Sequence, residues 1–172
     1  MYGRWMKHKT SAEAEVLCYN RGVKIYFGAD HRGFNLKETL KRVAEEWGYK
    51  VEDLGNEHFE EDDDYPDFAI KVGKKVSLAP DKSRGVLICG SGVGVDIAAN
   101  KFIGARSVLG ISEAQVKSAR EDDDVNVLSI AADFINREEA IKMLKVFLET
   151  DFKTEAKYRR RILKISEVEK NR

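Results

Sequence analysis

The feature that most constrains the fold is a regular alternation of short apolar segments with segments of helical periodicity. Apolar segments typical of strands cover residues 23–27, 49–54, 84–89, 105–110 and 125–131. Segments with helical spacing or capping residues cover 34–47, 66–78, 112–120, 136–150 and 154–170, and one more helix opens at a glycine turn and runs to residue 100. Five strands alternating with helices predict an α/β protein with a mostly parallel sheet and helices on both faces.

Local signals support several of these boundaries. Gly48 is expected to end the first helix, and Ser112 and Asn136 are expected to cap the starts of two later helices. The last helix is charged and amphipathic, with Ile162 and Ile165 on one side together with Val168. Because ligands of such sheets bind beyond the carboxyl ends of the strands, the loops that follow strands are the places to look for function.

Length and charge limit the classes of protein to consider. The chain has 172 residues, and its 30 basic and 30 acidic residues leave no formal net charge. We interpret this as one domain, residues 23–172, preceded by an extension of unknown role, residues 1–22. A balanced charge disfavours a broad nucleic-acid surface, although the basic run 158–161 suits a local anion site.

The sequence also predicts where the protein works and what it does not bind. The extension lacks the continuous apolar core of a signal peptide, and no apolar run approaches the ~20 residues of a membrane span, so we expect a cytoplasmic protein. Cys18 and Cys89 are both interpreted as reduced thiols. The acidic runs 60–64 and 121–124 lack the ligand spacing of a calcium loop, so we expect them to be solvated and predict no metal site.

Three segments that follow strands carry the candidate chemistry: residues 28–33, 89–94 and 120–126. Cys89 ends a strand just before a glycine turn whose backbone N–H groups favour negative charge, which suits a base or a nucleophile. The alternative is a buried cysteine that acts as a small apolar residue.

The glycine turn itself has two interpretations. Gly90, Gly92 and Gly94 let several N–H donors approach an oxyanion or a phosphate, but a tight turn would also need them. The dinucleotide fingerprint requires a third glycine where Val95 stands, and the Lys-Ser/Thr pair of a nucleoside-triphosphate loop is missing, so nucleotide binding is disfavoured.

Two further pairs of residues suit a sugar phosphate. Asp30 and His31 follow the first strand, where the carboxylate can hold a hydroxyl and the imidazole can donate to an oxygen; simple capping is the alternative for Asp30. Lys157 and Arg161 lie four residues apart on one face of the last helix, where they can grip one phosphate or form a solvated basic face.

Several spaced motifs together resemble a known family. They are Gly28-Ala29-Asp30-His31, Asp64-Tyr65-Pro66-Asp67-Phe68-Ala69, Ile88-Cys89-Gly90-Ser91-Gly92-Val93-Gly94, Ile97-Ala98-Ala99-Asn100-Lys101 and Asn126-Val127-Leu128. In this order they resemble ribose-5-phosphate isomerase B, a family related to the galactose-6-phosphate isomerase subunits, from about residue 23 to 168. The resemblance implies a Rossmann-like three-layer fold, a homodimer or dimer of dimers with sites at the subunit interface, a small sugar phosphate as substrate, and no cofactor.

The resemblance also implies roles for individual residues. Cys89 would be the base that moves a proton between C1 and C2 of the open-chain sugar, since Val95 replaces the glutamate that some relatives use. Ser91 would assist, and an enediolate would be stabilised by the N–H groups of the glycine turn with Asn100. The other implied substrate contacts are Asp30 to a hydroxyl, Tyr65 and Gly90 in the pocket wall, and His31, Lys157 and Arg161 to the phosphate.

Lys157 stands where the family usually has arginine, and two further positions depart from the family pattern more seriously. Asp122 aligns with the histidine that opens the sugar ring, and Asp133 aligns with an arginine that joins the phosphate grip. We interpret Asp122 as the candidate catalytic residue in place of this histidine. These departures leave two alternatives to ribose 5-phosphate isomerisation: an isomerase of another sugar, such as a tetrose phosphate, a hexose phosphate or an unphosphorylated sugar, or a catalytically silent sugar-phosphate binding protein.

Overall fold

A parallel sheet of five strands forms the centre of the molecule, a computed structural model that describes residues 22–171. The strands are β1 (Lys24–Ala29), β2 (Lys50–Asp53), β3 (Ser83–Cys89), β4 (Ser107–Gly110) and β5 (Val127–Ala131). Their order is β2-β1-β3-β5-β4, and every neighbouring pair is parallel. The predicted α/β class with a parallel sheet is confirmed.

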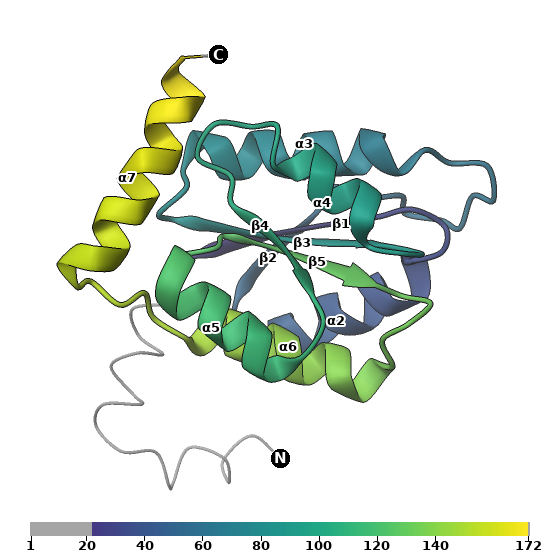
Figure 1. The fold of residues 1–172 in the computed structure, drawn as a ribbon. Coiled ribbons are helices and arrows are strands. Elements are labelled where there is room, and N and C mark those ends of the chain that lie inside the picture. The colour runs from purple at the N-terminus through teal and green to yellow at the C-terminus, as the bar shows by residue number, and fades with distance from the viewer. Residues whose placement is uncertain (1–21, 172) are drawn as a thin grey trace, which may run out of the picture.

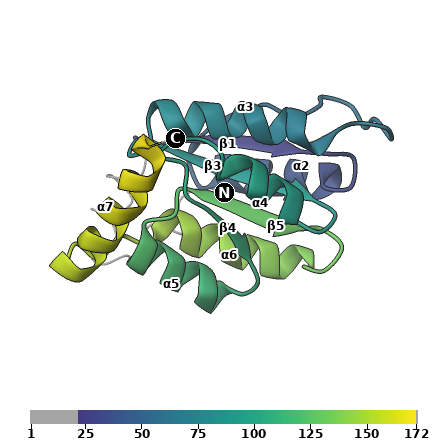
Figure 2. The same ribbon diagram turned by 45° about the horizontal axis from the view of Figure 1, so that its top comes forward.

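Helices cover both faces of this sheet. They are α2 (Phe34–Glu46), α3 (Tyr65–Leu78), α4 (Val93–Ala99), α5 (Glu113–Asp123), α6 (Arg137–Glu149) and α7 (Ala156–Lys170). Figure 1 shows α3 and α4 on one face and α2, α5 and α6 on the other, and the turned view in Figure 2 agrees. The predicted three layers are therefore present, with α7 standing at one end of the sheet.

Each face of the sheet has its own apolar core. Phe27 and Ile130 face the α2, α5 and α6 side and are fully buried there with Leu144. Leu87 and Val127 face the other side and pack with Val95 of α4. Because both faces of the central strands are covered, the strands read as continuous apolar runs rather than alternating ones.

The predicted caps form, and β4 and β5 each start two residues later than expected. The Ser112 side chain accepts a hydrogen bond from the Gln115 N–H at 3.2 Å, and Asn136 forms a capping box with Glu139. β4 begins two residues after the predicted start at Ala105. The Arg106 N–H donates to Asn126 Oδ1 at 2.8 Å, so a side chain takes the place of the strand ladder there.

The acidic run at the end of α5 is not solvated throughout, contrary to expectation. Asp124 has a left-handed backbone, with φ of 47°, and it ends the helix three residues later than predicted. Its carboxylate accepts from Arg106 Nη2 at 2.7 Å and from Arg120 Nη1 at 2.8 Å. Two arginines thus hold this carboxylate at the end of the sheet where the strands begin.

Some expectations fall outside the described residues. The extension 1–22 and Cys18 lie there, apart from Gly22. Among residues 22–171, no helix has both the length and the apolar character needed to cross a membrane.

Candidate active site

The chain changes direction across the sheet between β1 and β3, and this is where the candidate residues gather. From β1 the chain continues to β2 on one side, whereas β3 lies on the other side of β1. The loops after β1 and β3 therefore diverge at the carboxyl edge, which is the usual place for a ligand crevice in such sheets. The loop after β1 also contacts β3, because the Asp30 N–H donates to the Ile88 carbonyl at 3.3 Å.

Cys89 is the last residue of β3 and lies at this end of the sheet. It is 4% exposed, and the Gly92 N–H donates to its Sγ atom at 3.1 Å. Gly92 has a φ of 73°, a left-handed conformation that glycine adopts without strain, and this conformation turns its N–H back toward the sulfur. A backbone donor at this distance stabilises a thiolate, so the geometry suits a base or a nucleophile.

The remaining residues of the turn lie beside Cys89. Ser91 is exposed, and its hydroxyl oxygen accepts from the Val93 N–H at 3.4 Å. Tyr65, the first residue of α3, places its ring directly over Gly94, where an added Cβ would lie 2.5 Å from Cζ. The structure thus brings Tyr65 and the glycine turn together, as a pocket wall requires.

Asp30 caps its own turn. Its side chain is buried, and Oδ1 accepts a hydrogen bond from the Gly33 N–H at 3.0 Å. Burial raises the pKa of the Asp30 carboxyl above its ordinary value, and the Gly33 N–H opposes that shift. The capping alternative is therefore realised, at a position beside Cys89 where a substrate hydroxyl can also be held.

His31 is fixed by a carboxylate that we had expected to be solvated. Asp63 Oδ1 accepts from the His31 backbone N–H at 2.9 Å and lies 2.8 Å from ring atom Nδ1. Asn56 Nδ2 donates to the other Asp63 oxygen at 2.9 Å. The Asp63 side chain is only 5% exposed, which contradicts the expectation for the acidic run 60–64.

This contact sets both the charge and the direction of the imidazole. The hydrogen bond that the imidazole makes to the Asp63 carboxylate raises the pKa of His31 above its ordinary value of 6.5. Because Nδ1 faces Asp63, a ligand would meet the ring at Nε2. The arrangement suits an anion-binding histidine, and nothing in the spacing of Asp63 indicated this role.

Arg32 is a second residue that the sequence did not single out. Its Nη2 atom donates to Asp133 Oδ2, and its guanidinium lies against Gly90. The Asp133 N–H in turn donates to the Gly90 carbonyl at 3.1 Å. The loops after β1, β3 and β5 are thus joined at the edge that holds Cys89.

Four predicted site residues lie at the opposite end of the sheet, where the strands begin. Asn100 ends α4, and its amide is bonded to both the N–H and the carbonyl of Ser107, the first residue of β4. Within one chain it therefore does not reach the glycine turn. Asp122 lies near the end of α5, 3.4 Å from Lys153 Nζ, and Lys157 and Arg161 are carried by α7.

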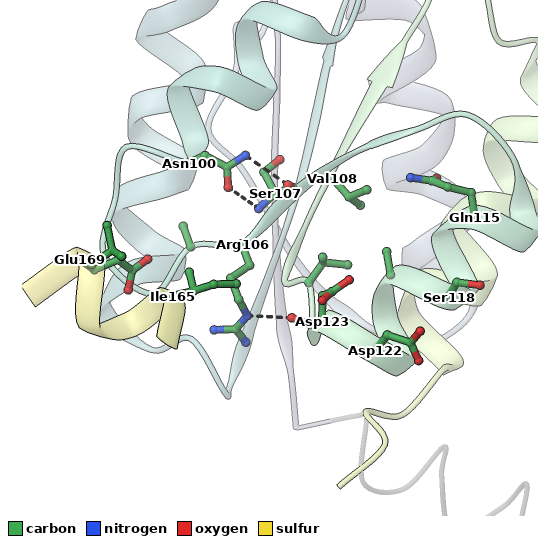
Figure 3. Close-up of a pocket in the computed structure, with 14 residues that line it drawn as sticks. Asn100, Arg106, Ser107, Val108, Gln115, Ser118, Asp122, Asp123, Ile165 and Glu169 are labelled. Atoms are coloured by element: carbon green, nitrogen blue, oxygen red, sulfur yellow. Dashed lines mark hydrogen bonds between the residues drawn. The ribbon is translucent and has the colours of Figure 1, made fainter. Parts of the chain in front are cut away.

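A groove connects two of these four residues, Asn100 and Asp122. It has a volume of about 740 Å³ and lies between the end of α4, β4, α5 and α7, as Figure 3 shows. Asn100, Arg106 and Asp122 line it together with the apolar side chains of Ile165 and Val168. Polar and apolar side chains are thus exposed together at the end of the sheet that lies far from Cys89.

No cluster of three or more metal-ligating side chains is found between residues 22 and 171. The prediction of a reaction without metal or cofactor remains a prediction.

Comparisons with known proteins agree on one family. Residues 25–165 match the sequence model of the ribose/galactose isomerases. A probable ribose-5-phosphate isomerase B of Mycoplasma genitalium is 41% identical over 146 residues, which cover 85% of this chain and 95% of that protein. The ribose-5-phosphate isomerase B of Mycobacterium tuberculosis strain H37Rv is 33% identical over 149 residues, 87% of this chain and 91% of that protein.

Solved structures give the same result. The crystal structure of Mycoplasma genitalium ribose-5-phosphate isomerase B with bound ribulose-5-phosphate matches with a TM-score of 0.84 at 40% identity, covering 87% of this chain and 98% of that one. The Clostridium thermocellum ribose-5-phosphate isomerase B matches with a TM-score of 0.82 at 34% identity, covering 87% and 99%.

Proposed function

The chain belongs to the ribose/galactose isomerase family, and from that membership we propose that it interconverts ribose 5-phosphate and ribulose 5-phosphate. The observation that carries the proposal is the Cys89 thiol at the switch point of the sheet, with the Gly92 N–H 3.1 Å from Sγ. The similarity to a structure that holds ribulose-5-phosphate supports the choice of substrate.

In the proposed reaction, the Cys89 thiolate removes the proton from C2 of the open-chain aldose. The electron pair of the C2–H bond forms the C1–C2 double bond, and the aldehyde oxygen at C1 takes the negative charge. After the proton on the C2 hydroxyl moves to this oxygen, the thiol returns its proton to C1 and the ketone forms at C2. N–H groups of the Gly90–Gly94 turn stabilise the enediolate, and Ser91 assists the transfer between the oxygens.

Other groups at this edge orient the substrate. Asp30 accepts from a sugar hydroxyl, Tyr65 forms one wall of the pocket, and His31 donates from Nε2 to the phosphate. Their positions support these roles, because all three residues lie on loops or helix starts at the carboxyl ends of the strands, as Cys89 does. The raised pKa of His31 favours the imidazolium that an anion requires.

The complete site would need a second copy of the chain. β3 has seven residues, so the two edges of the sheet are separated by roughly 20 Å. Asp122, Lys157 and Arg161 lie at the far edge and cannot contact a small sugar held at Cys89 of the same chain. We therefore propose a homodimer, or a dimer of dimers, in which each copy brings its far edge to the other's Cys89.

The exposed apolar residues of α7 support this assembly. The side chains of Leu163, Ile165 and Val168 are 63%, 47% and 60% exposed, although a helix on a monomer usually buries its apolar side. Ile165 and Val168 also line the groove beside Asp122, where a partner subunit would cover them.

Two carboxylates favour an alternative. Asp122 contacts Lys153 and Asp133 contacts Arg32, so neither position supplies an imidazole or a positive charge. Such a site also suits another sugar, including a tetrose phosphate, a hexose phosphate or an unphosphorylated sugar, or a protein that binds a sugar phosphate without turnover.

The test is to incubate the protein with ribose 5-phosphate and to follow the formation of ribulose 5-phosphate. We expect turnover that disappears in Cys89→Ala and is kept in Cys18→Ala, which controls for the loss of a thiol. Saturable binding without turnover would support the silent binder, and turnover only with another sugar would support that isomerase. Cytoplasmic localisation is part of the proposal and is checked by cell fractionation.

A further inference from the structure

Arg32 lies beside the glycine turn, outside the roles assigned above. Its side chain is 55% exposed, and it follows His31 directly in the loop after β1. The guanidinium rests on Gly90, where an added Cβ would lie 2.7 Å from Nη1 and still closer to Cζ and Nε. A side chain at position 90 would therefore displace the guanidinium from its place beside the residue that follows Cys89.

The loop that carries Arg32 is pressed against β3. At Gly33, an added Cβ would lie 2.6 Å from the Ile88 carbonyl oxygen, so only glycine allows this approach. The Asp30 N–H also donates to the same carbonyl. The backbone on both sides of Arg32 is thus held against β3, and this fixes the point above the turn from which the Arg32 side chain extends.

Asp133 fixes the direction of the guanidinium. It accepts from Nη2, and its own N–H is bonded to the Gly90 carbonyl, so the pair spans the loops after β1, β3 and β5. Guanidinium has five donors in a planar fork, and one contact to a carboxylate leaves others available. A planar fork matches the oxygens of a phosphate and grips it through more than one bond.

We propose that Arg32, held by Asp133 above Gly90, binds the phosphate group of the sugar substrate beside His31. The proposal rests on the sugar-phosphate substrate proposed above and adds a residue of this chain to its recognition. Arg32 has a second effect in the same place, because it neutralises the Asp133 carboxylate. Without Arg32, an unpaired negative charge would face the phosphate dianion.

These two effects predict a pattern among variants. Arg32→Ala loses the phosphate contact and exposes Asp133, so KM for ribose 5-phosphate and Ki for inorganic phosphate should both rise about 10-fold to 100-fold, with a smaller change in kcat. Arg32→Lys should keep the charge but lose the fork, with an intermediate rise. Asp133→Asn in the Arg32→Ala background should recover part of the loss, because the repulsive charge is gone.

The experiment compares steady-state kinetics and phosphate inhibition for these variants, with Arg42→Ala as the control. Arg42 is similarly exposed, at 59%, and pairs with Glu46 on the outer side of α2. If KM and Ki in Arg32→Ala stay within about twofold of the parent, or if Asp133→Asn does not relieve the defect, the proposal is wrong.

A failure of the isomerase proposal would be recognised separately. If the parent protein shows no turnover, titration calorimetry with ribose 5-phosphate and with inorganic phosphate replaces the kinetic assay. Weaker binding of both ligands by Arg32→Ala than by Arg42→Ala would support the role of Arg32. Equal binding by the two variants would overturn it, as would loss of thermal stability without loss of binding.

Discussion

Mixing two inactive variants should restore activity if each site is shared between two chains. One variant is Cys89→Ala, which removes the base at the carboxyl edge. The other is Lys157→Ala with Arg161→Ala, which removes the cations of α7 at the opposite edge. The roughly 20 Å along β3 places these groups too far apart to act on one sugar within a single chain.

The size of the recovery follows from counting sites. In an equal mixture of freely exchanging chains, about half of the dimers contain one chain of each kind. In such a dimer one site carries both defects, and the other combines an intact Cys89 with intact cations. About one quarter of all sites are then complete, so about one quarter of the parent kcat per chain should return.

The assay is ribulose 5-phosphate formation after the variants are mixed and allowed to exchange subunits. Exchange is verified with two affinity tags, and purified mixed dimers should show about half of the parent activity. Each variant taken alone through the same exchange procedure is the control. If tagged mixed dimers form but stay as inactive as the variants alone, the two groups do not share a site and the proposed assembly is wrong.

Two further predictions concern residues near Cys89. Asp63→Asn should lower the pKa of His31 toward its ordinary value, measured by NMR titration, and should raise KM more than Asp62→Asn, an exposed neighbour in the same loop. Because the His31 pKa is raised in the folded state, the His31–Asp63 pair adds stability that is complete below the ordinary histidine pKa and is lost as pH rises through the raised value. Asp63→Asn should therefore lower the unfolding free energy more at about pH 5.5 than at about pH 9. Equal losses at the two pH values would contradict this. Gly92→Ala should cost roughly 1–3 kcal/mol of unfolding free energy and most of the activity, because the φ of 73° is left-handed and an added Cβ would lie 2.5 Å from a leucine methyl. Chemical denaturation measures the unfolding free energy. An unchanged unfolding free energy would show that alanine is not strained at this position.

The elements of the fold were predictable because their signals are local. The alternation of apolar and helical segments spans a few residues at a time, and Ser112 and Asn136 act on N–H groups three positions ahead. β4 was placed two residues early because Asn126, 20 positions away, takes over the hydrogen bond of Arg106. Errors at boundaries thus come from partners that the local pattern does not contain.

The site was predictable only where a residue follows a strand. Cys89, Asp30 and His31 could be located from the topology, since parallel strands end at one edge. Asp63 reaches His31 across 32 positions and Arg32 reaches Asp133 across 101, so no spacing indicated either contact.

The order β2-β1-β3-β5-β4 has a consequence for how the chain folds during synthesis. Within residues 22–171, β4 pairs only with β5, which follows it in the sequence, so β4 has no neighbour in this sheet until residues 127–131 have left the ribosome. β1, β2 and β3, in contrast, can pair as soon as residue 89 is made. Synthesis therefore builds the half that carries Cys89 first, and the half that carries Asp122 and α7 waits for β5 to close the sheet.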